Sequence, residues 1–187
     1  MEPAMETRTE SVPVCGGASL ATSVILPGPG AYPVVIVRTV YGRRNLQGIG
    51  DVFGGHGYAT VIQDVRGSGE SRGQFGFLAQ EPEDSVRTAQ WVLDQPWCDG
   101  RLAILGISYL SAASVAIAAE FPEQVKAAVW VTVPVKKDLL CFQDGALRLH
   151  HTLPWTYMRT APLSGFAPEA LYRKMPLVEA IGPDADP

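Results

Sequence analysis

The stretch Arg101–Glu120, RLAILGISYLSAASVAIAAE, decides the predicted fold. Its apolar run Arg101–Leu105 is typical of a strand, and the alanine-rich residues 109–120 predict a helix. Gly106–Ser108 lies at the junction, and a serine on a sharp strand-to-helix turn can be presented as a nucleophile. Leu110 stands where the G-x-S-x-G pattern has glycine. A purely structural turn serine is therefore the alternative reading of this motif.

The flanking segments predict alternating strands and helices. Three further apolar runs are typical of strands buried in a parallel sheet: Val34–Val37, Tyr58–Gln63 and Val125–Val133. Two segments between them predict helices: Asn45–Gly55, short and irregular, and Pro82–Asp94. Ser11–Cys15 and Ser19–Leu26 predict a hairpin at the sheet edge. The order predicts an α/β fold, a mostly parallel sheet with flanking helices.

Composition bounds the function classes. With 187 residues, the chain is one domain or a piece of a larger one, and 47% hydrophobic with 18% charged residues is typical of an enzyme. The net charge of −4 disfavours nucleic acid as a partner, and no apolar run approaches the ~18 residues of a membrane span. The first ten residues lack the apolar core of a signal peptide, so a cytoplasmic location is expected.

Cysteine and histidine usage gives no sign of a metal centre. Cys15, Cys98 and Cys141 are odd in number and widely spaced, as expected of reduced thiols. No cluster of His, Cys and Asp has the spacing of a zinc site. We therefore expect neither a metal nor a cofactor.

Four motifs, in order along the chain, resemble a known family: Tyr32–Tyr41 (YPVVIVRTVY), Gly57–Gly73 (GYATVIQDVRGSGESRG), Gln95–Arg101 (QPWCDGR) and Gly106–Leu110 (GISYL). The chain resembles the N-terminal part of the cocaine esterase / Xaa-Pro dipeptidyl-peptidase-like α/β-hydrolases over roughly residues 12–135. The polar first residues predict a disordered tail over 1–10. The resemblance implies a C-terminally truncated α/β-hydrolase core over 11–135 and a partial helical cap over 136–187, and the prolines of residues 160–187 predict a Pro-rich tail at its end. Within the last part, Asp138–Thr160 is expected to be mostly helical, with no strand after it.

Two positions depart from the family pattern. The family's elbow, G-x-S-Y-x-G, has glycine three residues after the serine, where this chain has Ser111. Val40 stands where the family usually has proline before the tyrosine. A serine is small enough for the helix and strand to pack with a modest shift. Valine keeps the extended conformation but removes rigidity from the loop.

The resemblance implies roles for three residues. Ser108 would attack the acyl carbonyl of an ester, amide or X-Pro peptide. The backbone N–H of Tyr109 and the hydroxyl of Tyr41 would hold the oxyanion. The alternative for Tyr41 is a partly buried aromatic residue that covers a strand end. Asp64 and Arg66, just before the Gly67–Gly73 loop, are expected to pair and so to fix this loop.

A serine nucleophile needs a base and an orienting carboxylate, which in the family follow the cap. Asp138 is a candidate acid, with a solvated charge as its alternative, and His150 or His151 is a candidate base, with surface or packing roles as theirs. His56 is expected to be structural. The chain is thus predicted to be a serine hydrolase that is incomplete alone. The alternative is a non-catalytic remnant or interaction module that binds a complementary chain, or a second copy, through an open sheet edge.

Overall fold

The computed structural model describes residues 5–133, 141–160 and 173. The chain divides into two compact units, 1–133 and 134–187, and each is described by itself. The sequence had placed this division between residues 135 and 136. Among the described residues, no helix has the length and apolar character needed to cross a membrane.

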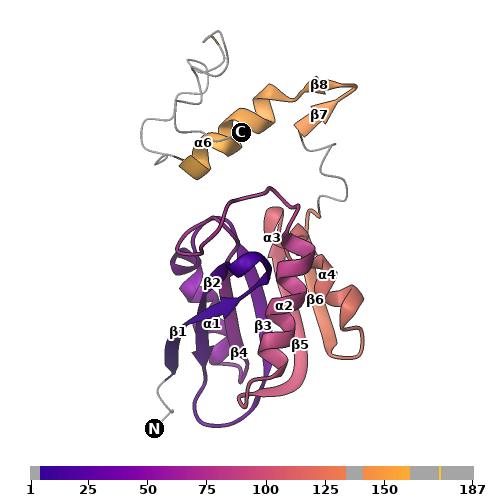
Figure 1. The fold of residues 1–187 in the computed structure, drawn as a ribbon. Coiled ribbons are helices and arrows are strands. Elements are labelled where there is room, and N and C mark those ends of the chain that lie inside the picture. The colour runs from indigo at the N-terminus through magenta and orange to yellow at the C-terminus, as the bar shows by residue number, and fades with distance from the viewer. Residues whose placement is uncertain (1–4, 134–140, 161–172, 174–187) are drawn as a thin grey trace. The chain divides into compact units, whose positions relative to one another are not determined.

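The first unit is built on a six-stranded sheet with the order β1-β2-β4-β3-β5-β6 (Figure 1). The strands are β1 (Glu6–Pro13), β2 (Ser19–Leu26), β3 (Tyr32–Thr39), β4 (Ala59–Asp64), β5 (Cys98–Ile107) and β6 (Val125–Val131). β1 and β2 form an antiparallel hairpin that joins the sheet through antiparallel pairing of β2 with β4, and β4, β3, β5 and β6 run parallel. The predicted hairpin and mostly parallel sheet are therefore confirmed.

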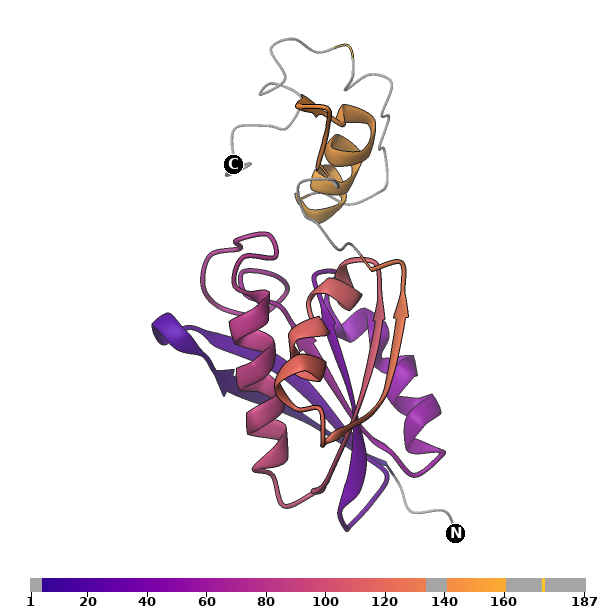
Figure 2. The same cartoon turned by 90° about the vertical axis from the view of Figure 1, so that its right-hand side faces the viewer.

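Helices cover both faces of this sheet (Figure 2). The first unit contains η1 (Cys15–Gly17), in the connection between β1 and β2, together with η2 (Arg43–Leu46), α1 (Gln47–Gly54), α2 (Glu81–Leu93), α3 (Tyr109–Ala112) and α4 (Val115–Glu120). On one face, Ala89 and Val92 of α2 and Ile117 of α4 pack on strand residues. On the opposite face, Ile49 and Phe53 of α1 pack on another apolar cluster. The apolar strand runs are thus buried on both sides, as a parallel sheet requires.

The predicted disordered tail is wrong for residues 6–10, because they form the first part of β1. All eight positions from Glu6 to Pro13 pair with β2, although every side chain except Val12 is exposed. An edge strand of this kind is held by its backbone pairing rather than by buried side chains. Its polar composition therefore gave no apolar pattern to recognise.

The single helix predicted over residues 109–120 is instead two short helices, α3 and α4, that meet at Ala113 and Ser114. The Ser114 hydroxyl donates to the Leu110 carbonyl at 3.1 Å, a bond that competes with helix geometry and bends it. In a continuous helix the Ile117 amide would donate to the Ala113 carbonyl. That carbonyl instead accepts Nη1 of Arg38 at 2.6 Å, and the Ile117 amide donates to the Ser114 carbonyl. The break thus arises from side-chain contacts that local propensity does not include.

β6 was predicted to be buried, but its residues are mostly exposed. The strand lies at the end of the strand order and pairs only with β5 among the described residues. Val129 and Val131 are 53% and 47% exposed, and Ile107 of β5, which pairs with Val131, is 56% exposed. These three side chains form an open patch. The patch lies on the same sheet face as α1, because alternate strand residues share a face and Leu105, two residues before Ile107, packs on the same cluster as α1.

The second unit contains β7 (Phe142–Gln143), β8 (Ala146–Leu147) and α6 (Leu149–Thr160). β7 and β8 form a small hairpin, whereas residues 138–160 were predicted to be mostly helical. Asp144 and Gly145 at its turn both have positive φ, 52° and 83°. Asp-Gly is a strong signal for such a two-residue turn, so the sequence did contain the information that the helical prediction overlooked.

Candidate active site

Ser108 sits on a strained turn between β5 and α3. Its φ of 55° and ψ of −118° lie outside the regions that non-glycine residues prefer, and its side chain is exposed. The turn is held in place because the Ser108 amide donates to the Val131 carbonyl of β6 at 2.8 Å. The strain therefore holds an exposed hydroxyl at the carboxyl end of a parallel strand, where α/β proteins bind their ligands.

Gly106 allows this turn by letting α3 approach the strand closely. A Cβ on residue 106 would lie 2.5 Å from the Ser111 nitrogen and 2.6 Å from the Leu110 carbonyl carbon. Ser111, which replaces the family's glycine, is fully buried, and its hydroxyl binds the Val131 carbonyl at 3.3 Å. The close approach thus depends on Gly106, and a serine at position 111 is accommodated with a hydrogen-bond partner.

Tyr41 lies at the same edge of the sheet as Ser108. β3 and β5 are adjacent parallel strands with Ile36 paired to Ile104, so four residues further along, position 40 is level with position 108. The Tyr41 backbone is fixed by a 3.0 Å bond from its amide to Thr39 Oγ1 and a 2.8 Å bond from Asn45 Nδ2 to its carbonyl. Its side chain is 39% exposed. The structure therefore brings these two predicted site residues to one edge, and the role of each stays a prediction.

The loop after β4 is organised around the buried carboxylate of Asp64. This carboxylate accepts the backbone amides of Arg43 at 2.6 Å and Glu70 at 3.0 Å, and Arg43 Nη2 also binds Glu70 at 2.6 Å. Burial raises the pKa of Asp64, although both amides and the Arg43 guanidinium oppose the shift. The raised pKa of Asp64 stabilises the folded chain at pH values below the pKa of Asp64 in the unfolded chain. This stabilisation is lost as the pH rises through the pKa of Asp64 in the folded chain. The network fixes the loop beside Tyr41.

The predicted pair between Asp64 and Arg66 is wrong. Arg66 instead makes a double hydrogen bond to the fully buried carboxylate of Asp84 on α2, at 2.6 and 3.0 Å. The chain leaves β4 after Asp64 and turns, so the two side chains no longer share a strand face. Two separate contacts therefore hold this loop, one between Asp64 and Arg43 of η2 and one between Arg66 and Asp84 of α2.

Sequence reasoning missed a buried ion pair beneath the elbow. Arg38 of β3 and Glu81 of α2 are almost fully buried, and Arg38 Nη1 lies 2.6 Å from Glu81 Oε2. The hydroxyl of Tyr109, whose backbone amide is the predicted oxyanion donor, binds Glu81 Oε1 at 2.8 Å. The one signal in the sequence was an arginine inside the apolar strand run YPVVIVRT, which required a buried partner.

A model of the X-Pro dipeptidyl-peptidase (S15) family matches residues 16–177, which include the whole elbow and its supporting strands. The chain belongs to the X-Pro dipeptidyl-peptidase (S15) family. It is 36% identical to the cocaine esterase of Rhodococcus sp. strain MB1 Bresler over 106 residues, which is 53% of this chain and 18% of the esterase. The predicted family resemblance is thus confirmed, and the family is one of hydrolases.

Solved structures with the same fold also resemble this S15-family chain. The aminopeptidase of the marine sediment archaeon Thaumarchaeota archaeon superposes with a TM-score of 0.71 and 26% identity, covering 84% of this chain and 30% of the aminopeptidase. The CocE/NonD family hydrolase of Staphylococcus aureus superposes with a TM-score of 0.68 and 21% identity, covering 83% and 32%. The predicted α/β-hydrolase fold is confirmed. The chain spans less than a third of the length of each of these relatives.

No histidine of residues 5–133 of this S15-family chain lies at the elbow. His56 is the one histidine in that range, and it precedes the amino end of β4, whereas Ser108 follows the carboxyl end of β5. Its Nδ1 lies 2.8 Å from the Val52 carbonyl, which agrees with the structural role expected of it. His150 and His151 lie on α6 in the second unit, and Asp138 lies outside the described residues.

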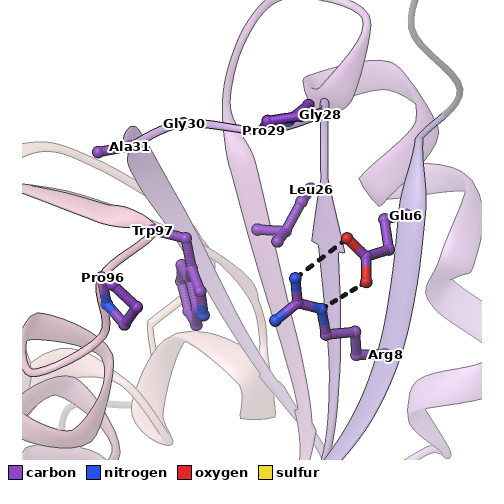
Figure 3. A pocket seen from close by; sticks show the side chains of 9 residues that line it. All are labelled: Glu6, Arg8, Leu26, Gly28, Pro29, Gly30, Ala31, Pro96 and Trp97. Atoms are coloured by element: carbon purple, nitrogen blue, oxygen red, sulfur yellow. Dashed lines mark hydrogen bonds and ion pairs between the residues drawn. The ribbon is translucent and has the colours of Figure 1, made fainter.

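A hollow of about 530 Å³ in this S15-family chain is not the site of Ser108 (Figure 3). The Glu6–Arg8 ion pair, Trp97 and the loop residues 28–31 line it. These loops precede β3 and β5, whereas Tyr41 and Ser108 follow the same strands. Eight residues of β3 span about 26 Å, so the hollow and the elbow lie at opposite ends of the sheet.

Proposed function

We propose that this chain carries the nucleophile of a serine hydrolase that cleaves an ester, amide or X-Pro peptide through an acyl-enzyme at Ser108. The observation that carries the proposal is the strained backbone of Ser108, whose φ of 55° holds an exposed hydroxyl on the strand-to-helix turn. Strain of this kind costs about 1–3 kcal/mol and persists where the surroundings enforce it, as they do at functional sites. Membership of a hydrolase family supports the same reading.

The reaction proceeds in two acyl transfers. Ser108 Oγ bonds to the carbonyl carbon while a base takes its proton, and the carbonyl oxygen becomes an oxyanion. The Tyr109 amide and the Tyr41 hydroxyl donate hydrogen bonds to that oxyanion. When the tetrahedral intermediate collapses, the bond to the alcohol or amine breaks and the leaving group takes the proton from the base. Water then attacks the acyl-serine by the same route, which releases the acyl group as a carboxylic acid and regenerates Ser108.

The base and its carboxylate come from outside residues 5–133 in this proposal, because His56 lies at the other end of the sheet. Their contribution is large. Loss of the histidine from a serine triad costs on the order of a million-fold in turnover, and the remaining oxyanion hole and binding give about 10³–10⁴ over water. The relatives' greater length is consistent with a further polypeptide segment that supplies both groups.

Labelling with a fluorophosphonate probe tests the proposal. The chain is incubated with the probe, alone and with the C-terminal remainder of an S15-family hydrolase added as a separate polypeptide, and the adduct is mapped by tandem mass spectrometry. We expect the adduct on Ser108, formed faster when the second polypeptide supplies the base. An adduct on another residue, or no adduct under either condition, would overturn the proposal.

The open patch favours a second role, docking of that complementary polypeptide. Ile107, Val129 and Val131 expose contiguous apolar surface on the α1 face, next to β6, which pairs on its outer side with no strand among the described residues. The occupant in this proposal is the remainder of an S15-family hydrolase core, which would add a parallel strand beside β6 and cover the patch. This extends the sheet beyond the six strands described.

Val129→Lys is expected to weaken this association by about tenfold or more, because docking would bury an unpaired ammonium group. The dissociation constant is measured by analytical ultracentrifugation with the second polypeptide. Val52→Lys is the matched control, since Val52 is 61% exposed on α1, a helix that packs on β2 and β4, whereas the patch lies on β5 and β6. Equal binding by the Val129 variant and the wild type would refute the docking site. Self-association of the wild-type chain that Val129→Lys abolishes would identify a second copy as the occupant.

A cytoplasmic location is part of the same proposal. All three cysteines are free thiols in the structure. Thiols persist where glutathione and thioredoxin keep the compartment reducing, as in the cytosol.

A further inference from the structure

The ion pair between Arg38 and Glu81 is not expected to add much to the stability of the fold. Arg38 is 0% exposed and Glu81 6%, so both charges lose their hydration on folding. A buried pair of this kind often stabilises less than apolar side chains of the same size would. The Nη2 nitrogen of Arg38 is buried and makes no hydrogen bond to the described residues, which adds to the cost. The contacts that the pair makes with α3 suit a positioning role better than a stabilising one.

The pair binds both ends of the short helix that follows Ser108. Glu81 Oε1 accepts the hydroxyl of Tyr109, the first residue of α3, at 2.8 Å. Arg38 Nη1 donates to the carbonyl of Ala113, directly after α3, at 2.6 Å. Two anchors therefore hold a four-residue helix that is too short to be rigid by itself.

The pair is fixed in turn to the sheet. Arg38 Nε donates to Gln63 Oε1 of β4 at 2.8 Å, and the Thr88 hydroxyl of α2 donates to the same oxygen at 2.8 Å. Gln63 Nε2 reaches Thr22 Oγ1 of β2 at 3.0 Å, and all these groups are buried. A continuous chain of hydrogen bonds thus runs from β2 through β4 and β3 to the elbow.

The ring of Tyr109 completes the anchor. It is buried, and its centroid lies 6.1 Å from those of both Phe75 and Phe77. The Leu78 amide also donates to its hydroxyl at 3.3 Å. The side chain of Tyr109 is therefore held at its tip and along its ring, which restricts rotation of the peptide group between Ser108 and Tyr109.

We propose that Arg38 and Glu81 are positioning residues that fix the backbone from Ser108 to Ala113, and so aim the Tyr109 amide at the site of the oxyanion. The aiming role rests on the proposed acyl-enzyme at Ser108. Neither residue touches the substrate, since both act through the Tyr109 hydroxyl and the Ala113 carbonyl. An oxyanion donor stabilises the developing charge only where it is already oriented. Loosening the peptide group between Ser108 and Tyr109 should therefore lower the reaction rate before it unfolds the protein.

Tyr109→Phe tests the anchor by removing one hydroxyl and leaving the ion pair intact. We expect the second-order rate of fluorophosphonate labelling at Ser108 to fall about tenfold or more. We also expect faster amide hydrogen exchange at Ser111, Ala112 and Ala113, whose amides are bonded within α3. Tyr32→Phe is the matched control, because its hydroxyl binds the Pro29 carbonyl at 3.0 Å at the far end of β3. That variant should change neither measurement.

The two readouts separate this proposal from the proposed function. Unchanged exchange in Tyr109→Phe would overturn the anchoring of the elbow, whatever the labelling shows. Faster exchange with an unchanged labelling rate would overturn the aiming role. If the wild type takes no label with or without the second polypeptide, the acyl-enzyme fails and the aiming role with it, and exchange alone then decides whether the pair fixes the backbone. Glu81→Gln keeps an acceptor for the Tyr109 hydroxyl but places an amide NH2 opposite Arg38 Nη1, so it breaks the buried ion pair and should speed exchange more than Tyr109→Phe does.

Discussion

Gly106→Ala is expected to lower the free energy of unfolding of the first unit by about 3 kcal/mol or more. The added Cβ would lie 2.5 Å from the Ser111 nitrogen and 2.6 Å from the Leu110 carbonyl carbon, closer than real Cβ atoms approach. Both are backbone atoms, so no side chain can rotate out of the way. Moving α3 would also break the bond between the Ser108 amide and Val131. Urea denaturation followed by circular dichroism measures the change.

Gly48→Ala supplies the control for that experiment. Gly48 lies in α1, and a Cβ there would meet nothing within 4 Å. Since alanine favours a helix over glycine by about 0.5–1 kcal/mol, this variant should be more stable than the wild type. Replacing glycine with alanine is thus expected to lower the free energy of unfolding at position 106 and to raise it at position 48. A Gly106 variant as stable as the wild type would show that the strand and helix do not approach as closely as described.

The sequence predicted the central strands and the elbow because these elements depend on local patterns. The apolar runs around Val34 and Ala59 reflect burial on both faces of the sheet. The turn at Ser108 follows from small residues beside an alanine-rich helix. β1 escaped prediction because an exposed edge strand is held by backbone pairing, which leaves no apolar period in the side chains.

The supports of the candidate site could not be predicted in the same way. Arg38 and Glu81 are 43 residues apart in sequence, and only the fold brings β3 and the start of α2 together. Similarly, Asp64 and Arg66 are neighbours of opposite charge, and their pairing was the natural expectation from the sequence. The structure gives each a different partner because the chain turns between them. The positions of the motifs could therefore be predicted from the sequence. The contacts that orient the motif residues could not, because they depend on tertiary packing.

Ser108→Gly is expected to abolish fluorophosphonate labelling and, at the same time, to stabilise the fold by about 1 kcal/mol. The variant removes the hydroxyl that attacks the phosphorus of the probe. It also removes the Cβ that makes a φ of 55° and ψ of −118° unfavourable, a strain of about 1–3 kcal/mol. Glycine loses about 0.5–1 kcal/mol of this gain because its unfolded backbone is more flexible. Labelling and urea denaturation on the same sample measure both effects.

Ser108→Ala separates the two causes, because it removes the hydroxyl but keeps the Cβ. It should lose labelling as completely as Ser108→Gly while its free energy of unfolding stays within about 0.5 kcal/mol of the wild type. A glycine variant no more stable than the alanine variant would show that the backbone at Ser108 is unstrained. Retained labelling in either variant would place the nucleophile elsewhere. Loss of labelling together with higher stability in Ser108→Gly would mean that the strained turn lowers the stability of the fold and presents a reactive hydroxyl. This combination is expected of a nucleophile and not of a structural turn serine.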